Sequence, residues 1–150
     1  MRKPLSTRAH GMIDQTWMAA AVALSARYDA TSTARLLQRA AAVARTSSMM
    51  TNYENGTVRV LPVKAHLAVD VALCTVLIAS PWILPESERR FAAIPVALGI
   101  VGLVASLLTK TRSPMEIDEE RGFFGPGDAM ATVDQDPDIA AHPHLRAHLE

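Results

Sequence analysis

Two short stretches of this sequence carry the same pair of residues that can handle protons and metal ions. His10 and Asp14 lie four positions apart, and His66 and Asp70 repeat that spacing in the second half of the chain. Residues four apart share one face of an α-helix, so each pair would present an imidazole and a carboxylate together. Imidazoles exchange protons near neutral pH and bind transition metals, and carboxylates bind cations. These four residues form the candidate polar or ion site.

The site admits three interpretations, which the sequence leaves open. In the leading one, the pairs are structural and tie two parts of the chain together, with the carboxylates paired to Arg39, Arg45 or Lys64. In the second, they form a proton or cation site in a small transporter or channel-like oligomer. In the third, both histidines hold a haem or another metal in a membrane redox protein. The identity of any metal is not indicated.

The surroundings of the two pairs indicate an internal duplication. Residues 8–14 and 64–70 both read as a basic residue, Ala, His, three variable residues and Asp. A proline precedes each element, and an apolar run, a short loop and a second helical segment follow it. Self-similarity of this kind is typical of repeated supersecondary units. We predict two repeats, at about 5–52 and 61–112.

The second repeat contains two apolar segments long enough to cross a bilayer. Residues 91–108 carry no charge, and residues 67–84 carry only Asp70. A bilayer core of about 30 Å needs about 17–25 such residues in a helix. In the first repeat, residues 11–28 and 33–50 are more polar, and the latter contains arginines. Their place in the duplication is the reason to expect that they span as well.

These observations predict an all-α integral membrane protein. The fold is a four-helix bundle made from two repeated transmembrane helical hairpins, covering residues 1–112. Residues 113–150 are rich in acidic residues, Pro and Gly, which predicts a flexible, disordered tail in the cytoplasm. Basic residues cluster at the side that carries both ends of the chain. The positive-inside rule then predicts a multi-pass protein of the inner (plasma) membrane with both termini cytoplasmic.

A tripeptide at the end of the third apolar segment is recognisable. Ser80, Pro81 and Trp82, together with the preceding residues 62–70, resemble the SPW-repeat family of small bacterial integral membrane proteins. The resemblance implies a membrane location and two-helix repeats, and it implies no settled biochemical activity. The first repeat lacks the tripeptide. Physically, the motif favours an interfacial anchor and helix terminator, because proline removes a backbone donor and tryptophan suits the membrane interface.

Small residues recur along one face of the last apolar segment. They stand at alternating spacings of three and four: Ala92, Pro95, Gly99, Gly102 and Ser106. Stripes of small side chains let helices approach closely in lipid, where association depends on packing. We expect this stripe to pack within the bundle, with contact between copies in a homo-oligomer as the alternative.

Charge and composition narrow the functional classes. The 15 basic and 15 acidic side chains balance, so no basic field exists to attract nucleic acid. The single cysteine, Cys74, excludes a disulfide framework within the chain. No nucleophile–base pair, phosphate-binding loop or metalloprotease motif occurs. We therefore predict a non-catalytic protein with no cofactor, whose biochemical role the sequence does not reveal and whose partner is the lipid bilayer.

Overall fold

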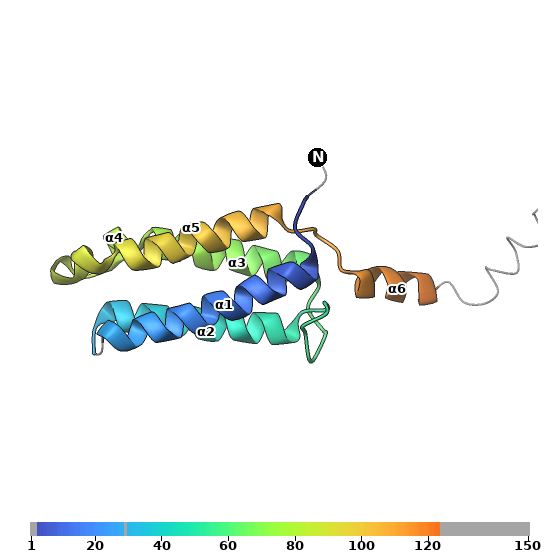
Figure 1. Ribbon diagram of the computed structural model, residues 1–150, viewed down its shortest axis with the longest axis horizontal. Coiled ribbons are helices and arrows are strands. Elements are labelled where there is room, and N and C mark those ends of the chain that lie inside the picture. Colours follow the sequence, from blue (N-terminus) through green and yellow to red (C-terminus); the bar gives the residue numbers. More distant parts are fainter. Residues whose placement is uncertain (1–2, 29, 124–150) are drawn as a thin grey trace, which may run out of the picture. The chain divides into compact units, whose positions relative to one another are not determined.

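Helices make up the regular structure of the computed structural model, which describes residues 3–28 and 30–123 (Figure 1). The four long helices are α1 (Thr7–Ser25), α2 (Ser32–Met50), α3 (Val63–Ile78) and α5 (Ala93–Leu108). The shorter ones are η1 (Ala26–Tyr28), α4 (Ser80–Ile83), η2 (Glu86–Phe91) and α6 (Pro114–Phe123). Within these ranges no strand forms, and only two isolated β-bridges occur. The predicted all-α class is confirmed.

Both segments predicted to span a membrane in the second repeat are divided in the structure. Residues 67–84 are split between α3 and α4 at Ala79, just before Pro81, and residues 91–108 begin in η2. A proline lacks the backbone N–H that a continuous helix requires, which accounts for the break near Pro81. Among the described residues, no helix combines the length and the apolar character that crossing a membrane demands.

The long helices form two hairpins that pack against each other. α1 packs along α2, and α3 packs along α5, while contacts between α2 and α3 and between α1 and α5 join the hairpins (Figure 1). Small residues make the closest approach: a Cβ atom added to Gly99 of α5 would lie 2.8 Å from the Cys74 carbonyl oxygen of α3. Gly99 and Gly102 of the predicted stripe therefore lie against α3.

Helix α2, the most polar of the predicted spans, is an integral member of this arrangement. Its buried face is made mainly of small residues, including Ala34, Ala40, Ala41 and Ala44 around Leu37. Alanine is the best helix former and permits close packing on α1. Thr31 caps the start of the helix, because its hydroxyl oxygen accepts a hydrogen bond from the Ala34 N–H. The arginines of α2 lie on its exposed face.

The chain segments that flank the hairpins are paired crosswise. Leu5, ahead of α1, pairs with Thr109 at the end of α5, and Leu61, ahead of α3, pairs with Thr51 at the end of α2. Two backbone hydrogen bonds support each bridge, with donor–acceptor distances of 2.8–3.1 Å. Each hairpin entrance is thereby fixed to the exit of a neighbouring helix, which positions the first turns of α1 and α3 side by side.

The predicted flexible tail begins with a helix. α6 starts at Pro114, where Ser113 Oγ donates to the Asn52 carbonyl oxygen at 2.7 Å and the Glu116 carboxylate accepts from the Val63 N–H at 2.6 Å. These bonds extend the compact unit to Glu116, beyond the predicted boundary at residue 112, and a second unit follows it. The rest of the predicted tail, residues 124–150, lies outside the described residues.

Candidate metal centre

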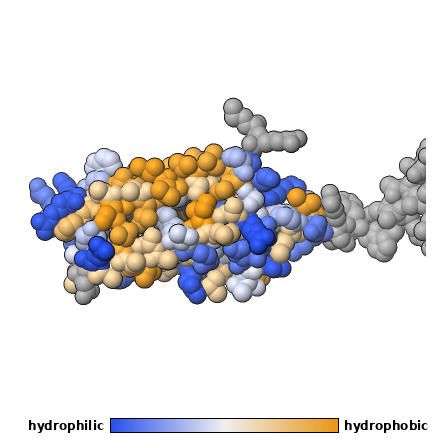
Figure 2. Space-filling model, viewed as in Figure 1, coloured by the Kyte–Doolittle hydropathy of each residue, from blue (hydrophilic) through white to orange (hydrophobic). Residues whose placement is uncertain are grey.

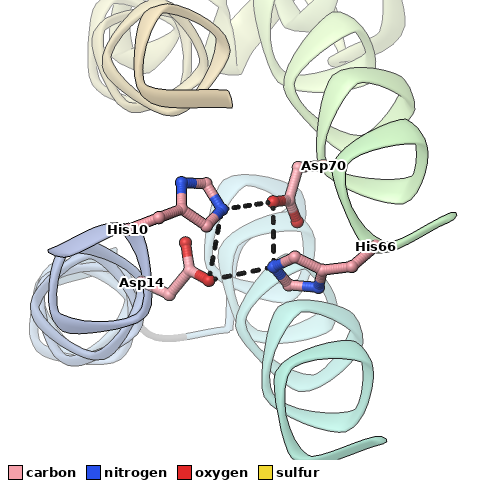
Figure 3. A group of neighbouring side chains, drawn as sticks. All are labelled: His10, Asp14, His66 and Asp70. Atoms are coloured by element: carbon pink, nitrogen blue, oxygen red, sulfur yellow. Dashed lines mark hydrogen bonds and ion pairs between the residues drawn. The ribbon is translucent and has the colours of Figure 1, made fainter. Parts of the chain in front are cut away.

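Four ionisable side chains converge where the first turns of α1 and α3 meet (Figure 3). Asp70 Oδ2 lies 3.1 Å from His10 Nε2 and 3.2 Å from His66 Nε2. Asp14 Oδ2 lies 3.6 Å from His10 Nε2 and 3.1 Å from His66 Nε2. The two nitrogens and two oxygens therefore alternate around a closed ring, which we call the His/Asp ring. The structure brings together all four residues of the predicted ion site.

The His/Asp ring is buried, and its charges are balanced from within. The exposed fractions of His10, His66 and Asp70 are 2%, 1% and 7%, and Asp14 is partly buried. The four ion pairs of the ring each join a histidine to an aspartate. The predicted partners Arg39, Arg45 and Lys64 have exposed side chains instead. Arginine and lysine have long side chains that can reach water, so the exposed faces of α2 and α3 retain them.

A threonine at the end of α5 fixes the orientation of His10. Thr109 Oγ1 donates its hydrogen to the Ala105 carbonyl oxygen at 2.6 Å and lies 2.9 Å from His10 Nδ1. Because a hydroxyl has one hydrogen, His10 Nδ1 must be the donor in the second contact. With a proton on Nδ1, Nε2 can face Asp70 in one of two forms. It either carries a second proton, so that the ring is charged, or it has a lone pair that can bind a cation.

His66 is held by a different set of neighbours. Its Nδ1 lies 2.6 Å from Ser47 Oγ of α2, a hydroxyl that can act as donor or acceptor there. The ring of Tyr53 stacks on the His66 ring with centroids 5.7 Å apart, and the Tyr53 hydroxyl hydrogen-bonds the Ser48 hydroxyl. Burial raises the pKa of Tyr53 to about 12, so its hydroxyl stays neutral. The loop after α2 thus covers one side of the His/Asp ring.

Gly11 makes room for that cover. A Cβ atom at Gly11 would lie 2.5 Å from Cε2 of Tyr53 and 2.9 Å from Nδ2 of Asn55. Gly11 also follows His10 directly, so the absence of a side chain lets the Tyr53 loop lie close to α1. The corresponding position in the second predicted repeat is Leu67, which is buried.

The donor atoms of the His/Asp ring match the dimensions of a metal site. A zinc-like ion with ligand distances of about 2.0–2.2 Å holds neighbouring donor atoms about 3.0–3.5 Å apart. Three of the four neighbouring distances lie within that range and the fourth exceeds it slightly. All four donor atoms lie within 4.8 Å of one another. The Nδ1 atoms of both histidines contact hydroxyls, and metal-binding histidines typically have a hydrogen-bond partner at this second nitrogen.

The predicted interfacial motif lies apart from this centre. Trp82 is 79% exposed, in keeping with a side chain that contacts solvent or lipid, while Ser80 is fully buried. Ser80 Oγ has no hydrogen-bond partner among the described residues, so it does not satisfy a carbonyl freed by Pro81. Its backbone carbonyl oxygen accepts from the Leu84 N–H at 2.9 Å. The motif forms the first three residues of α4, after the break that follows α3, and it is not part of the His/Asp ring.

Sequence reasoning missed the residues that orient the histidines. The sequence does contain a feature that points to Thr109, because a threonine follows the second helical segment of both predicted repeats. No sequence feature distinguishes Ser47 or Tyr53 from the serines and tyrosines that are common near the ends of helices. The chain matches no protein-family model, no curated protein and no solved structure. The resemblance to the SPW-repeat family therefore stays a prediction.

Proposed function

We propose that this chain is a metal-binding protein in which one divalent transition-metal ion joins the two helical hairpins. The convergence of two imidazole nitrogens and two carboxylate oxygens in one buried ring carries this proposal. Histidine suits Zn²⁺, Fe²⁺, Co²⁺ and similar ions, and a mixed set with two carboxylates keeps the site open to several of them. Ca²⁺ and Mg²⁺ prefer oxygen ligands throughout and fit this set poorly.

Charge favours a divalent over a monovalent ion. Asp14 and Asp70 together contribute two negative charges, and neutral histidines contribute none. One divalent ion makes the ring neutral, whereas a monovalent ion leaves a net negative charge in a buried site, where unpaired charge is costly. The ring contains no competing ammonium or guanidinium group, because the nearby basic side chains are exposed. The ion would bridge α1 and α3 in the place of direct hydrogen bonds.

We also propose that the helices lie in a lipid bilayer, as the sequence predicts. Large apolar side chains are exposed on α5 (Ile100, Val101, Val104, Leu107 and Leu108). Figure 2 shows apolar residues gathered along the face that α5 lines, with hydrophilic residues at the two ends of the helical region. An apolar surface of this extent on an isolated chain favours contact with lipid or another protein. The purified protein should require detergent; a monodisperse state in plain buffer would contradict this placement.

Cobalt titration of the full-length protein tests the metal site. Stripped of metal with a chelator, the protein should bind one Co²⁺ per chain, develop visible absorption from histidine and carboxylate ligation, and unfold at a higher temperature. Asp14→Asn should weaken Co²⁺ binding by more than about 100-fold, beyond the roughly 10–100-fold typical when a residue that only hydrogen-bonds a metal ligand is changed. Asp118→Asn in α6 is the matched control, because Asp118 is exposed and should leave binding unchanged.

The same experiment identifies the main competing role. If neither Co²⁺, Zn²⁺ nor Fe²⁺ raises the unfolding temperature of the wild-type protein, the metal proposal is wrong. The His/Asp ring would then act as a structural ion-pair cross-link, and Asp14→Asn would lower stability without any metal dependence.

A further inference from the structure

A small hollow lies directly beside the His/Asp ring. It has a volume of about 20 Å³ and is bounded by both carboxylate residues and by side chains one turn further along their helices. All four long helices contribute to its wall, with Trp17 from α1, Ala44 from α2, Cys74 from α3 and Gly102 from α5. A single water molecule needs about 10–15 Å³. The hollow therefore accommodates one water or a molecule of two non-hydrogen atoms.

The wall of the hollow offers little else for a guest to bind. The Trp17 indole N–H donates to the Leu98 carbonyl oxygen at 2.9 Å, and the Ser106 hydroxyl donates to the Gly102 carbonyl oxygen at 2.9 Å. Both donors are therefore committed within the protein. The rest of the wall is mostly apolar. A guest would be held chiefly from the side of Asp14 and Asp70, where the metal is proposed.

Close packing of α3 on α5 sets the size of the hollow. A Cβ atom at Gly102 would lie 2.6 Å from Cys74 Sγ and 3.5 Å from Trp17 Nε1. An alanine there would push the Cys74 thiol out of its position or enter the hollow itself. The hollow thus depends on the glycine at position 102, because the neighbouring side chains leave no room for a larger residue.

We propose that the metal keeps one coordination position open toward this hollow, occupied by an exchangeable water that a neutral diatomic molecule can replace. This inference rests on the proposed metal site. Four protein ligands leave a fifth position free in ions that accept five or six ligands, and open positions of this kind distinguish reactive from purely structural sites. A neutral guest preserves the charge balance of the buried ring, and a small one is all that the volume admits.

Nitric oxide is the probe, because it is neutral, diatomic and binds Fe²⁺ that has a free or water-occupied position. The full-length protein in detergent is loaded with Fe²⁺ without oxygen, its iron content is measured, and NO is added. The expected result is the electron paramagnetic resonance signal of a high-spin iron–nitrosyl complex. Iron that binds in the expected amount but gives no such signal would overturn the open position and leave the metal site standing. Absence of iron binding would also overturn this inference, whereas the metal site itself fails only if Co²⁺ and Zn²⁺ do not bind either.

A matched pair of variants tests whether the ligand enters the hollow. Ala44→Val adds two methyl groups on the buried wall and should weaken NO binding by about tenfold, equivalent to about 1.4 kcal/mol, while iron binding persists. Ala42→Val makes the same change on the exposed face of α2 and should leave NO binding unchanged. Equal NO affinity in both variants would show that the ligand approaches from elsewhere and would overturn the proposal. If Ala44→Val fails to bind iron, Cys74→Val applies the same test from the α3 wall.

Discussion

The two histidines of the ring occupy equivalent places in the predicted repeats but are held differently. His10 contacts Thr109, a helix-ending threonine whose hydrogen is committed to a backbone carbonyl. The equivalent threonine, Thr51, makes the same backbone bond, to the Ser47 carbonyl oxygen at 2.6 Å, yet His66 contacts the Ser47 hydroxyl instead. Repeated residues can thus reach a common centre while the side chains that hold them differ.

The two histidines are held differently because one pair of equivalent positions in the two repeats carries different residues. The position of α5 equivalent to Ser47 is Ala105, which has no hydroxyl, so His10 depends on Thr109 alone. The tautomer of His10 is thereby fixed, while the proton between His66 and Ser47 is free to sit on either atom. His66 has the stacked Tyr53 ring as additional support. The first histidine is therefore oriented by a hydrogen bond of fixed direction, and the second by a hydrogen bond together with ring stacking.

The largest effect should come from removing one of the carboxylates that link the histidines. Asp70→Asn takes away the more deeply buried carboxylate and leaves both histidines short of a partner. Breaking a buried ion pair from one side typically costs about 3–5 kcal/mol. We expect a loss of this size in the free energy of unfolding, measured by denaturant titration of the metal-free protein in detergent. Asp14→Asn should cost less, because Asp14 is partly exposed; an equal or greater cost would contradict the difference in burial.

The second prediction compares the contributions of two hydroxyls to stability, that of Thr109 at His10 and that of Ser47 at His66. Thr109→Val keeps the side-chain shape but leaves His10 Nδ1–H buried without an acceptor, which should cost about 1–3 kcal/mol in the free energy of unfolding. Ser47→Ala should cost less, because the Tyr53 ring still packs on His66. Co²⁺ affinity should also fall more in Thr109→Val. The assignment of Thr109 as the stronger support would fail if the two variants changed stability and affinity equally.

The third prediction concerns the cover over the ring. In an exposed helix, glycine to alanine normally stabilises by about 0.5–1 kcal/mol. At Gly11 the sign should reverse, because the new methyl group would meet the Tyr53 ring and Asn55, and overpacking costs about 1–3 kcal/mol. Thermal unfolding of Gly11→Ala would measure the net effect. Gly11→Ala combined with Tyr53→Leu should recover part of the loss; stabilisation by Gly11→Ala alone would show that the loop is not packed on α1.

The smallest effect is expected at the opposite end of the hairpins. The backbone N–H groups of Ser32 and Thr33, followed by the Thr33 hydroxyl, hold the pKa of Glu88 below its ordinary value of 4.5. When the pKa of a carboxyl group is lowered by folding, the group stabilises the folded protein at pH values above its ordinary pKa. This contribution disappears as the pH falls through the folded-state pKa. Glu88→Gln should therefore unfold slightly more easily at neutral pH than the wild type. The difference should vanish in acid; a difference that persists there would point to packing instead.

Sequence reasoning identified the helical class and the four ring residues as a group worth testing, because a spacing of four places His and Asp on one helix face. Sequence reasoning did not predict which groups pair with the two aspartates. Arg39 and Arg45 were candidates on the basis of charge alone, but their helical positions face away from the buried side of α2. Contacts such as Thr109 with His10 join residues far apart in the chain, and they depend on how the hairpins pack, which one sequence does not specify.

The crosswise pairing of Leu5 with Thr109 has a consequence for synthesis. The N-terminal segment emerges from the ribosome first, yet its backbone partner is made only after all four long helices have been translated. Contacts between residues so distant in sequence form slowly, because a large loop must close before they contribute. The segment at Leu5 must therefore wait without its native partner, and release of an incomplete chain before Thr109 would yield a product with the His10 half of the centre unassembled.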